Sequence, residues 1–240
     1  MKVGSGELYT GLKLLDGSHE LPSGGSCLVE AAIFAAGFEY QAVGCGADAP
    51  SCFCPTLSDM CITINDILPE GPRQKLMKYL PMLPGSYHGV GLQRRREKLA
   101  VIMTTREILY RVLLSLGERK QARFVRVATS PQYLVRKMEE LDHQLLFKYY
   151  LRDMLQLQEA FERYLVMGPH PAESTANWFL VHYRQMSMDS PSRKKGRRYL
   201  PTSFFFTLLD AVFALGKVGN VPPEVLNPRL IELERMREVA

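Results

Sequence analysis

The five cysteines are the side chains in this sequence best suited to metal binding or covalent chemistry, and all of them lie between positions 27 and 61. Cys45, Cys52, Cys54 and Cys61 place four thiols within 17 residues, which makes them the candidate ligands of a zinc ion. Structural zinc sites usually pair their cysteines about two to four residues apart, whereas these residues form a C-x-C pair flanked by longer gaps. The spacing therefore favours buried, reduced cysteines that act as small hydrophobic side chains.

Cys27 is the candidate nucleophile, because it follows Gly24-Gly25-Ser26 at the predicted start of a helix. A helix N-terminus lowers the pKa of a thiol and so favours the reactive thiolate. Papain-like proteases place their cysteine in a comparable position, and His143 or His182 would be the candidate base here. The residues that follow Cys27 are small and apolar, however, which favours a core helix with an unreactive thiol.

Several short motifs accompany the cysteines between about residues 21 and 117. They are Cys27-Leu28-Val29-Glu30-Ala31, Ala36-Gly37, Cys52-x-Cys54-Pro55, Asn65-Asp66, Leu68-Pro69, Arg73-Gln74-x-Leu76 and Arg94-Arg95-Arg96. In combination they resemble a family of uncharacterised bacterial and phage proteins with a CL(M/V)EA…AG…C.CP…ND.LP…RQ.L pattern. That family has no established activity, so the resemblance implies a bacterial or phage setting and assigns no catalytic residue.

Charge is distributed unevenly along the chain. Residues 1–70 carry a net charge of −7, residues 71–137 carry +12, and residues 138–240 are neutral overall. Basic side chains in the middle part can neutralise phosphates, and Tyr110 or Phe124 between them could stack on bases. The alternative is a solvated basic surface. The candidate residues for binding nucleic acid or an acidic partner are Arg94, Arg95, Arg96, Lys98, Arg106, Arg119, Lys120, Arg123, Arg193, Lys194, Lys195, Arg197 and Arg198.

Apolar residues recur with helical periodicity along most of the chain, which predicts an all-α fold. We expect an irregular multi-helix bundle of about eight to ten helices with negligible sheet. The predicted helices cover residues 27–36, 55–68, 72–80, 92–116, 118–128, 131–167, 174–186, 203–215 and 229–239. Ser26 and Ser130 are predicted caps, and Arg94, Arg95, Arg96 and Lys98 are expected to project into solvent. The predicted organisation is an N-terminal arm (1–20), a main helical domain (21–188), a basic loop or hinge (189–199) and a C-terminal helical segment (200–240).

No catalytic motif appears in the sequence. It lacks the glycine-rich nucleotide loops, the HExxH pair of zinc proteases and the GxSxG of serine hydrolases. Glu139, Glu140, Asp142 and His143 form one acidic–histidine cluster, but one such cluster leaves a carboxylate metal site incomplete. These observations favour a protein without a cofactor and without enzymatic activity.

We therefore predict a helical binding protein, phage- or mobile-element-encoded, that contacts a host protein or ribonucleoprotein as an inhibitor or adaptor. One alternative is a sequence-nonspecific nucleic-acid-binding protein that uses residues 71–137, and another is a Cys27-dependent thiol hydrolase. An odd number of cysteines and a start without an apolar signal segment predict a cytoplasmic protein. The most apolar run, residues 204–215, is short and contains Asp210, so no membrane contact is expected.

Overall fold

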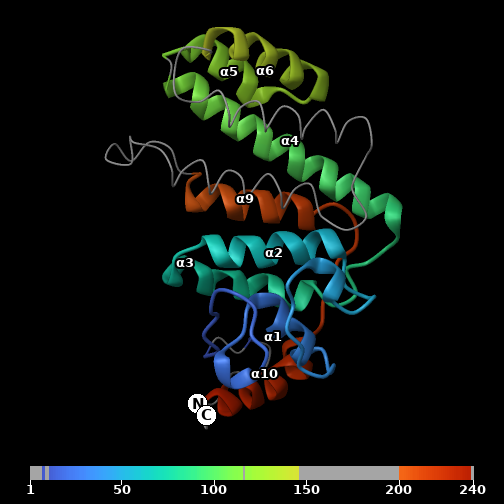
Figure 1. The fold of residues 1–240 in the computed structure, drawn as a ribbon. Helices are drawn as coiled ribbons and strands as arrows, with labels where there is room; N and C mark the ends of the chain where they lie inside the picture. The colour runs from blue at the N-terminus through green and yellow to red at the C-terminus, as the bar shows by residue number, and fades with distance from the viewer. Residues whose placement is uncertain (1–6, 9–10, 116, 146–199, 239–240) are drawn as a thin grey trace. The chain divides into compact units, whose positions relative to one another are not determined.

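The computed structural model describes residues 7–8, 11–115, 117–145 and 200–238. Within these residues the chain forms eight α-helices and no strand, which confirms the predicted all-α fold (Figure 1). The chain divides into unit 1, Met1–Arg96 with Leu209–Ala240, and unit 2, Glu97–Leu208. The predicted organisation into an arm, a main domain, a basic hinge and a C-terminal segment stays a prediction. None of the helices in the described ranges is both long enough and apolar enough to cross a bilayer.

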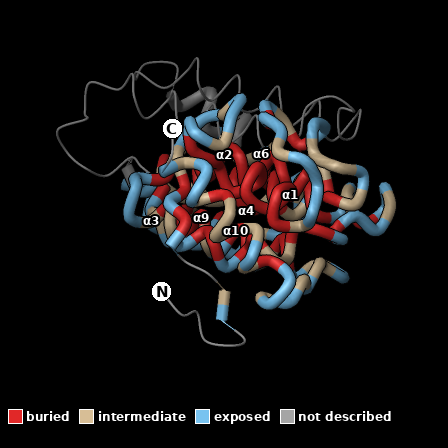
Figure 2. The backbone as a smooth tube through the Cα atoms, turned by 90° about the horizontal axis from the view of Figure 1, so that it is seen from below, coloured by how far each residue is buried: buried red, intermediate tan, exposed pale blue. Residues whose placement is uncertain are grey.

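Unit 1 is built around a short helix that is buried on every side. This helix, α1 (Leu28–Ala35), has all of its residues buried (Figure 2). A helix without a polar face must be covered on all sides, and α1 contacts three other helices of the unit. These are α2 (Pro55–Ile67), the 3-10 helix η3 (Lys75–Met82) and α10 (Pro223–Glu238). The sequence therefore places its most uniformly apolar short helix at the centre of this unit.

The start of α1 is fixed by a carboxylate inside the helix. Cys27 is the N-cap residue, and its backbone N–H donates to Glu30 Oε2 at 2.8 Å. Ser26, the predicted cap, instead donates its hydroxyl proton to the carbonyl oxygen of Gly25 at 2.8 Å. The predicted cap is therefore wrong by one residue: the helix follows Cys27, whose backbone N–H is held by the Glu30 carboxylate as in a capping box.

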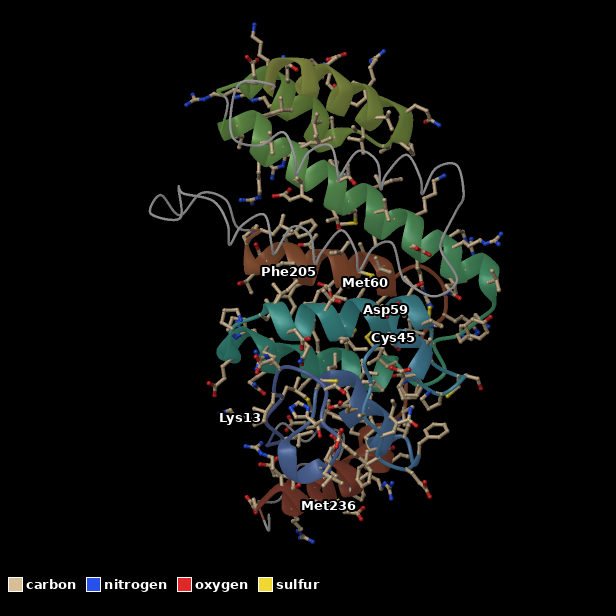
Figure 3. The ribbon with its side chains drawn as sticks, viewed as in Figure 1. Lys13, Cys45, Asp59, Met60, Phe205 and Met236 are labelled. Atoms are coloured by element: carbon tan, nitrogen blue, oxygen red, sulfur yellow. The ribbon has the colours of Figure 1, made fainter. Side chains whose placement is uncertain are left out.

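Helix α2 begins at Pro55, as predicted, and ends before Leu68. It packs against the loop that contains the 3-10 helix η2 (Gly46–Asp48), where the buried Asp59 accepts a hydrogen bond from the backbone N–H of Gly46. Figure 3 shows Asp59 on α2 beside the loop that carries Cys45. A β-carbon on Gly46 would lie 2.1 Å from the carbonyl oxygen of Pro55, so this close approach requires glycine.

The later part of the predicted N-terminal arm packs firmly on unit 1. Leu12 and Leu14 are buried. The backbone N–H of Leu14 donates to Gln74 Oε1 at 2.8 Å, and Gln74 Nε2 donates back to the carbonyl oxygen of Leu14 at 2.9 Å. Gln74 ends α3 (Glu70–Gln74), the short helix that precedes η3. The hydrogen bonds of the Gln74 side chain thus hold the backbone at Leu14 in place, although this segment forms neither helix nor strand.

Unit 2 contains most of α4 (Val90–Ser115), together with α5 (Arg119–Val127) and α6 (Pro131–Leu145). Gly117, with a φ of +86°, separates α4 from α5 at the predicted position. Ser130 caps α6 as predicted, since the backbone N–H of Tyr133 donates to its hydroxyl at 3.3 Å. Local stop and start signals therefore predict the break between α4 and α5 and the start of α6 correctly.

Two boundaries near the end of the chain differ from the prediction. Helix α9 covers Thr202–Phe213, one residue earlier than predicted at its start and two residues shorter at its end. Helix α10 begins at Pro223 and continues through Pro228, whereas a start at Arg229 was predicted. Proline suits the first turn of a helix, and Pro223 takes that position. The helix predicted over residues 174–186, the end of the one predicted over 131–167 and the loop 189–199 lie outside the described residues.

Candidate functional site

The exposed side of α5 carries most of the candidate binding residues of unit 2. We define the basic α5 face as the six residues of this helix that are exposed to solvent: Arg119, Lys120, Arg123, Phe124, Arg126 and Val127. The opposite side of the helix packs inward through Ala122 and Val125, which are both fully buried. The packing of two small apolar residues therefore orients four cations and two apolar side chains outward.

The spacing of these residues groups them along the helix. Arg119 and Arg123 are four residues apart, as are Lys120 and Phe124, so each pair lies on the same side of α5. Phe124 is 67% exposed, an unusual value for a phenylalanine in a folded unit. The face thus presents an accessible aromatic ring one helical turn from a lysine, on a helix that also exposes three arginines.

The basic α5 face has no acidic side chain of its own. Glu118, the N-cap residue, accepts a hydrogen bond from Gln121 Nε2 at 3.3 Å. In the described part of the chain, Arg119, Lys120 and Arg123 form no ion pair with a carboxylate. Like charges within about a Debye length of 8–10 Å reinforce one another, so the face produces a concentrated positive potential.

Two neighbouring side chains support the face from α4. The guanidinium of Arg126 lies 5.1 Å from the ring centroid of Tyr110, which holds it by a cation–π contact. The candidate Arg106 is half-buried, and its Nη1 lies 3.5 Å from the carbonyl oxygen of Ala128. Tyr110 and Arg106 therefore have contacts within unit 2, and Phe124 is the more accessible aromatic.

The first turns of α4 carry a second set of candidates, one of which does not face solvent. Arg94 and Arg95 of unit 1 and Lys98 of unit 2 are exposed. Arg96 is completely buried, so its predicted projection into solvent is wrong. Its guanidinium donates to the carbonyl oxygens of Ser86 at 2.7 Å, Lys217 at 2.8 Å and Leu215 at 3.2 Å. These three acceptors replace water around the charge.

The basic loop that the sequence also singled out lies outside the described residues. Its candidates are Arg193, Lys194, Lys195, Arg197 and Arg198. The same holds for His182 and for the side chain of His143, the two candidate bases, and for the side chains of Glu139 and Asp142. The described candidate binding residues therefore lie on α4 and α5.

The structure opposes the nucleophile hypothesis for Cys27. The thiol is fully buried at the start of α1. Burial, and secondarily the nearby Glu30 carboxylate, raise the pKa of the Cys27 thiol far above its usual range. A catalytic thiol needs an accessible thiolate, which both effects disfavour. The residue instead belongs to the hydrogen-bonded start of a core helix.

The other four cysteines do not form a metal-binding group in the described residues. Cys54 and Cys61 are buried, and Cys45 and Cys52 are half-buried. Burial is the main cause of a strongly raised pKa at the Cys61 thiol, which again opposes thiolate formation. The interpretation of Cys61 as a buried side chain of α2 is confirmed, and all five thiols are unpaired.

A buried polar cluster around Glu30 was not predicted. Besides the amide of Cys27, the Glu30 carboxylate accepts the backbone N–H of His19 at 2.8 Å and lies 3.0 Å from His19 Nδ1. Tyr40 donates its hydroxyl proton to the carbonyl oxygen of Gly25 at 2.8 Å. His19 lies in a segment without periodicity, so no local signal in the sequence pairs it with Glu30. The cluster joins three loops to the start of α1.

A second unpredicted group surrounds Asp210 in unit 1. Asp210 Oδ1 accepts hydrogen bonds from Lys78 Nζ at 2.9 Å and from the Tyr79 hydroxyl at 2.8 Å. Partial burial alone would raise the pKa of Asp210, but these hydrogen bonds and the Lys78 charge hold it below its usual value. The Tyr79 ring stacks on Phe213 with centroids 5.0 Å apart. These contacts fix the end of α9 against η3.

Comparison with known proteins adds no relative: no protein-family model, curated protein or solved structure matches the chain. Function must therefore be inferred from the surfaces themselves. Among the described residues, the basic α5 face combines three cations that form no ion pair there with an aromatic ring that is 67% exposed.

Proposed function

We propose that this protein is a non-enzymatic binding protein that holds single-stranded nucleic acid, without sequence preference, on the basic α5 face. The observation that carries this proposal is the presence of four exposed cations and the exposed Phe124 ring on one nine-residue helix. Basic side chains contact the phosphates of a strand, whatever its sequence. An accessible aromatic ring stacks on any base, which contributes roughly 1–3 kcal/mol per base.

The exposure of Phe124 favours single strands over duplexes. In a duplex the base faces are already stacked, and a ring on the surface of a helix cannot reach them. A cationic patch alone would bind both forms through their phosphates. Basic side chains and an accessible aromatic ring on one face, as with Arg119, Arg123 and Phe124, are instead the combination that single-strand-binding surfaces use.

A protein or ribonucleoprotein partner is the second candidate, and Val127 favours it. This side chain is 72% exposed beside Phe124, and an aliphatic group gains little from a nucleic acid backbone. The two apolar side chains would anchor an acidic partner surface while the cations pair with its carboxylates. An inhibitor or adaptor of a host complex, encoded by a phage or mobile element, would act in this way. We place either function in the cytoplasm, where the five free thiols remain reduced.

The nucleic-acid proposal predicts a large effect from neutralising the face. We expect the triple variant Arg119→Gln, Lys120→Gln, Arg123→Gln to bind a fluorescein-labelled oligothymidine at least about tenfold more weakly than the wild type, because three phosphate contacts are lost. Phe124→Ala should also weaken binding, by about 1–3 kcal/mol. Fluorescence anisotropy at several salt concentrations measures both effects. The slope of log K against log salt should be shallower in the triple variant.

The matched control removes the same charge elsewhere. Lys13→Gln, Lys75→Gln and Arg235→Gln change three exposed cations of unit 1 and should leave affinity within about twofold, since nonspecific charge effects are weak at physiological salt. Equal losses in the two triple variants would refute the site on α5. Failure of the wild type to bind any oligothymidine, together with Phe124-dependent capture of a protein, would support the second candidate instead.

A further inference from the structure

Unit 1 has a cationic pocket of its own. The pocket is a depression that is largely open to solvent, with a volume of about 500 Å³, and it is lined by His88, Gly91, Leu92, Arg95, Gly216 and Lys217. Three of these side chains can carry a positive charge, and none is acidic. The volume is within the range of small-molecule sites, so it can hold a phosphate together with part of an organic group.

The two walls of the pocket come from distant parts of the sequence and are joined by the buried Arg96. Residues 88–95 form one wall, and residues 216–217 form the other. The Arg96 guanidinium donates to the carbonyl oxygens of Ser86 at 2.7 Å and of Lys217 at 2.8 Å. Because one rigid, planar group holds both segments, Arg95 and Lys217 are kept on the same cavity.

Two glycines bring the walls into close contact. Gly216 has a φ of +81°, and a β-carbon there would lie 2.9 Å from both terminal carbons of Leu92. Gly219 donates its N–H to the carbonyl oxygen of Met82 at 3.0 Å, and a β-carbon on it would lie 1.6 Å from the carbonyl oxygen of Pro84. The positive φ of Gly216 and the close approach of Gly219 to the backbone of Pro84 therefore favour glycine at both positions of the loop after α9.

The charges of the pocket are not balanced within the described residues. Neither Arg95 nor Lys217 forms an ion pair there, and the lining contains no carboxylate. Arg96 adds a buried positive charge behind the wall and is itself bonded to carbonyl oxygens, not to an anion. The local field therefore favours an anion in the cavity.

We propose that this pocket binds the phosphate group of a phosphate monoester. A guanidinium offers a bidentate fork to phosphate oxygens, an ammonium adds a point charge, and the imidazole of His88 adds a further donor. Two permanent cations match the double negative charge of a monoester better than the single charge of a carboxylate. The phosphate could belong to a free phosphorylated metabolite or to the 5′ end of a nucleic acid strand. The proposal does not depend on the basic α5 face.

Adenosine monophosphate and adenosine are the probes that test this site, with isothermal titration calorimetry as the readout. We expect the monophosphate to bind the full-length protein and adenosine not to bind. Arg95→Gln and Lys217→Gln should each weaken binding at least about tenfold, as expected for loss of one charge-assisted contact. Arg94→Gln, an exposed neighbour on α4 that does not line the pocket, is the matched control and should bind like the wild type.

A second arm identifies the source of the phosphate. Oligothymidines with and without a 5′-phosphate are compared on the α5 triple variant, so that binding by α5 does not interfere. Arg95-dependent preference for the 5′-phosphate would assign the pocket to strand ends. If adenosine monophosphate binds but the oligothymidine with a 5′-phosphate binds no better than the one without it, the pocket is assigned to a phosphorylated metabolite. The proposal is overturned if adenosine monophosphate binds no better than adenosine. It is also overturned if Arg94→Gln loses as much affinity for the monophosphate as Arg95→Gln, provided that all variants have the melting temperature of the wild type.

Discussion

Arg96→Met is expected to lower the free energy of unfolding by about 2–4 kcal/mol, because each buried acceptor that loses its hydrogen bond costs about 1–3 kcal/mol. The reason is that three carbonyl oxygens, those of Ser86, Leu215 and Lys217, lose the donor that the buried guanidinium provides, and the bond to Ser86 is itself buried. Methionine fills similar volume but donates no hydrogen bond. Urea unfolding followed by far-UV circular dichroism measures the change.

Two further variants make this prediction specific. Arg94→Met removes an exposed arginine from the same helix and should change stability by less than about 0.5 kcal/mol. Arg96→Lys should be intermediate, because a single ammonium cannot reach three acceptors in the geometry of a guanidinium. A loss below about 1 kcal/mol in Arg96→Met would mean that the freed carbonyl groups find other partners, and that Arg96 does not hold the two segments together.

Glu30→Ala is the second change with a large expected effect, about 3–5 kcal/mol of unfolding free energy. The Glu30 side chain is fully buried and accepts the backbone N–H groups of Cys27 and His19, both at 2.8 Å. His19 Nδ1 lies 3.0 Å from it as well. Alanine leaves these groups unpaired and opens a cavity at the start of α1. Urea unfolding again gives the magnitude.

The control for Glu30 is Glu39→Ala, which removes an exposed carboxylate from the loop after α1 and should be close to neutral. Glu30→Gln keeps one acceptor oxygen but turns an amide NH₂ toward a donor, so we expect a loss between those of the two alanine variants. If Glu30→Ala and Glu39→Ala were equally stable, the hydrogen bonds of the Glu30 cluster would contribute nothing to the fold.

The features predicted correctly from sequence are those with local causes. Pro55 begins α2, Gly117 separates α4 from α5, and Ser130 caps α6. Each of these signals acts through backbone geometry or hydrogen bonds within a few residues. The residues next to a helix end are therefore enough to predict where that helix starts or stops. The all-α class follows from the same local periodicity.

The features that sequence could not predict depend on distant partners. Arg96 lies off the apolar stripe of its helix, yet carbonyl groups more than one hundred residues away bury it. Leu12 and Leu14 show no periodicity, yet Gln74 and the surrounding core fix them. Arg95 and Lys217 share a pocket only because the loop after α9 returns to the start of α4. Sequence patterns among neighbouring residues cannot predict these contacts, because the partners are far apart in the sequence.

Photochemical cross-linking tests nucleic-acid binding by the basic α5 face most directly, because it locates the strand on the protein. The wild-type protein is irradiated with an oligonucleotide that contains 5-bromouridine and is then cleaved after glutamate. Glu118 and Glu139 bracket the face, with no acidic residue between them, so residues 119–139 form a single fragment. We predict that the main adduct lies in this fragment, at Phe124 or an adjacent residue; absence of any adduct, or adducts only in fragments from residues 1–96 and 209–240, would contradict the proposed function.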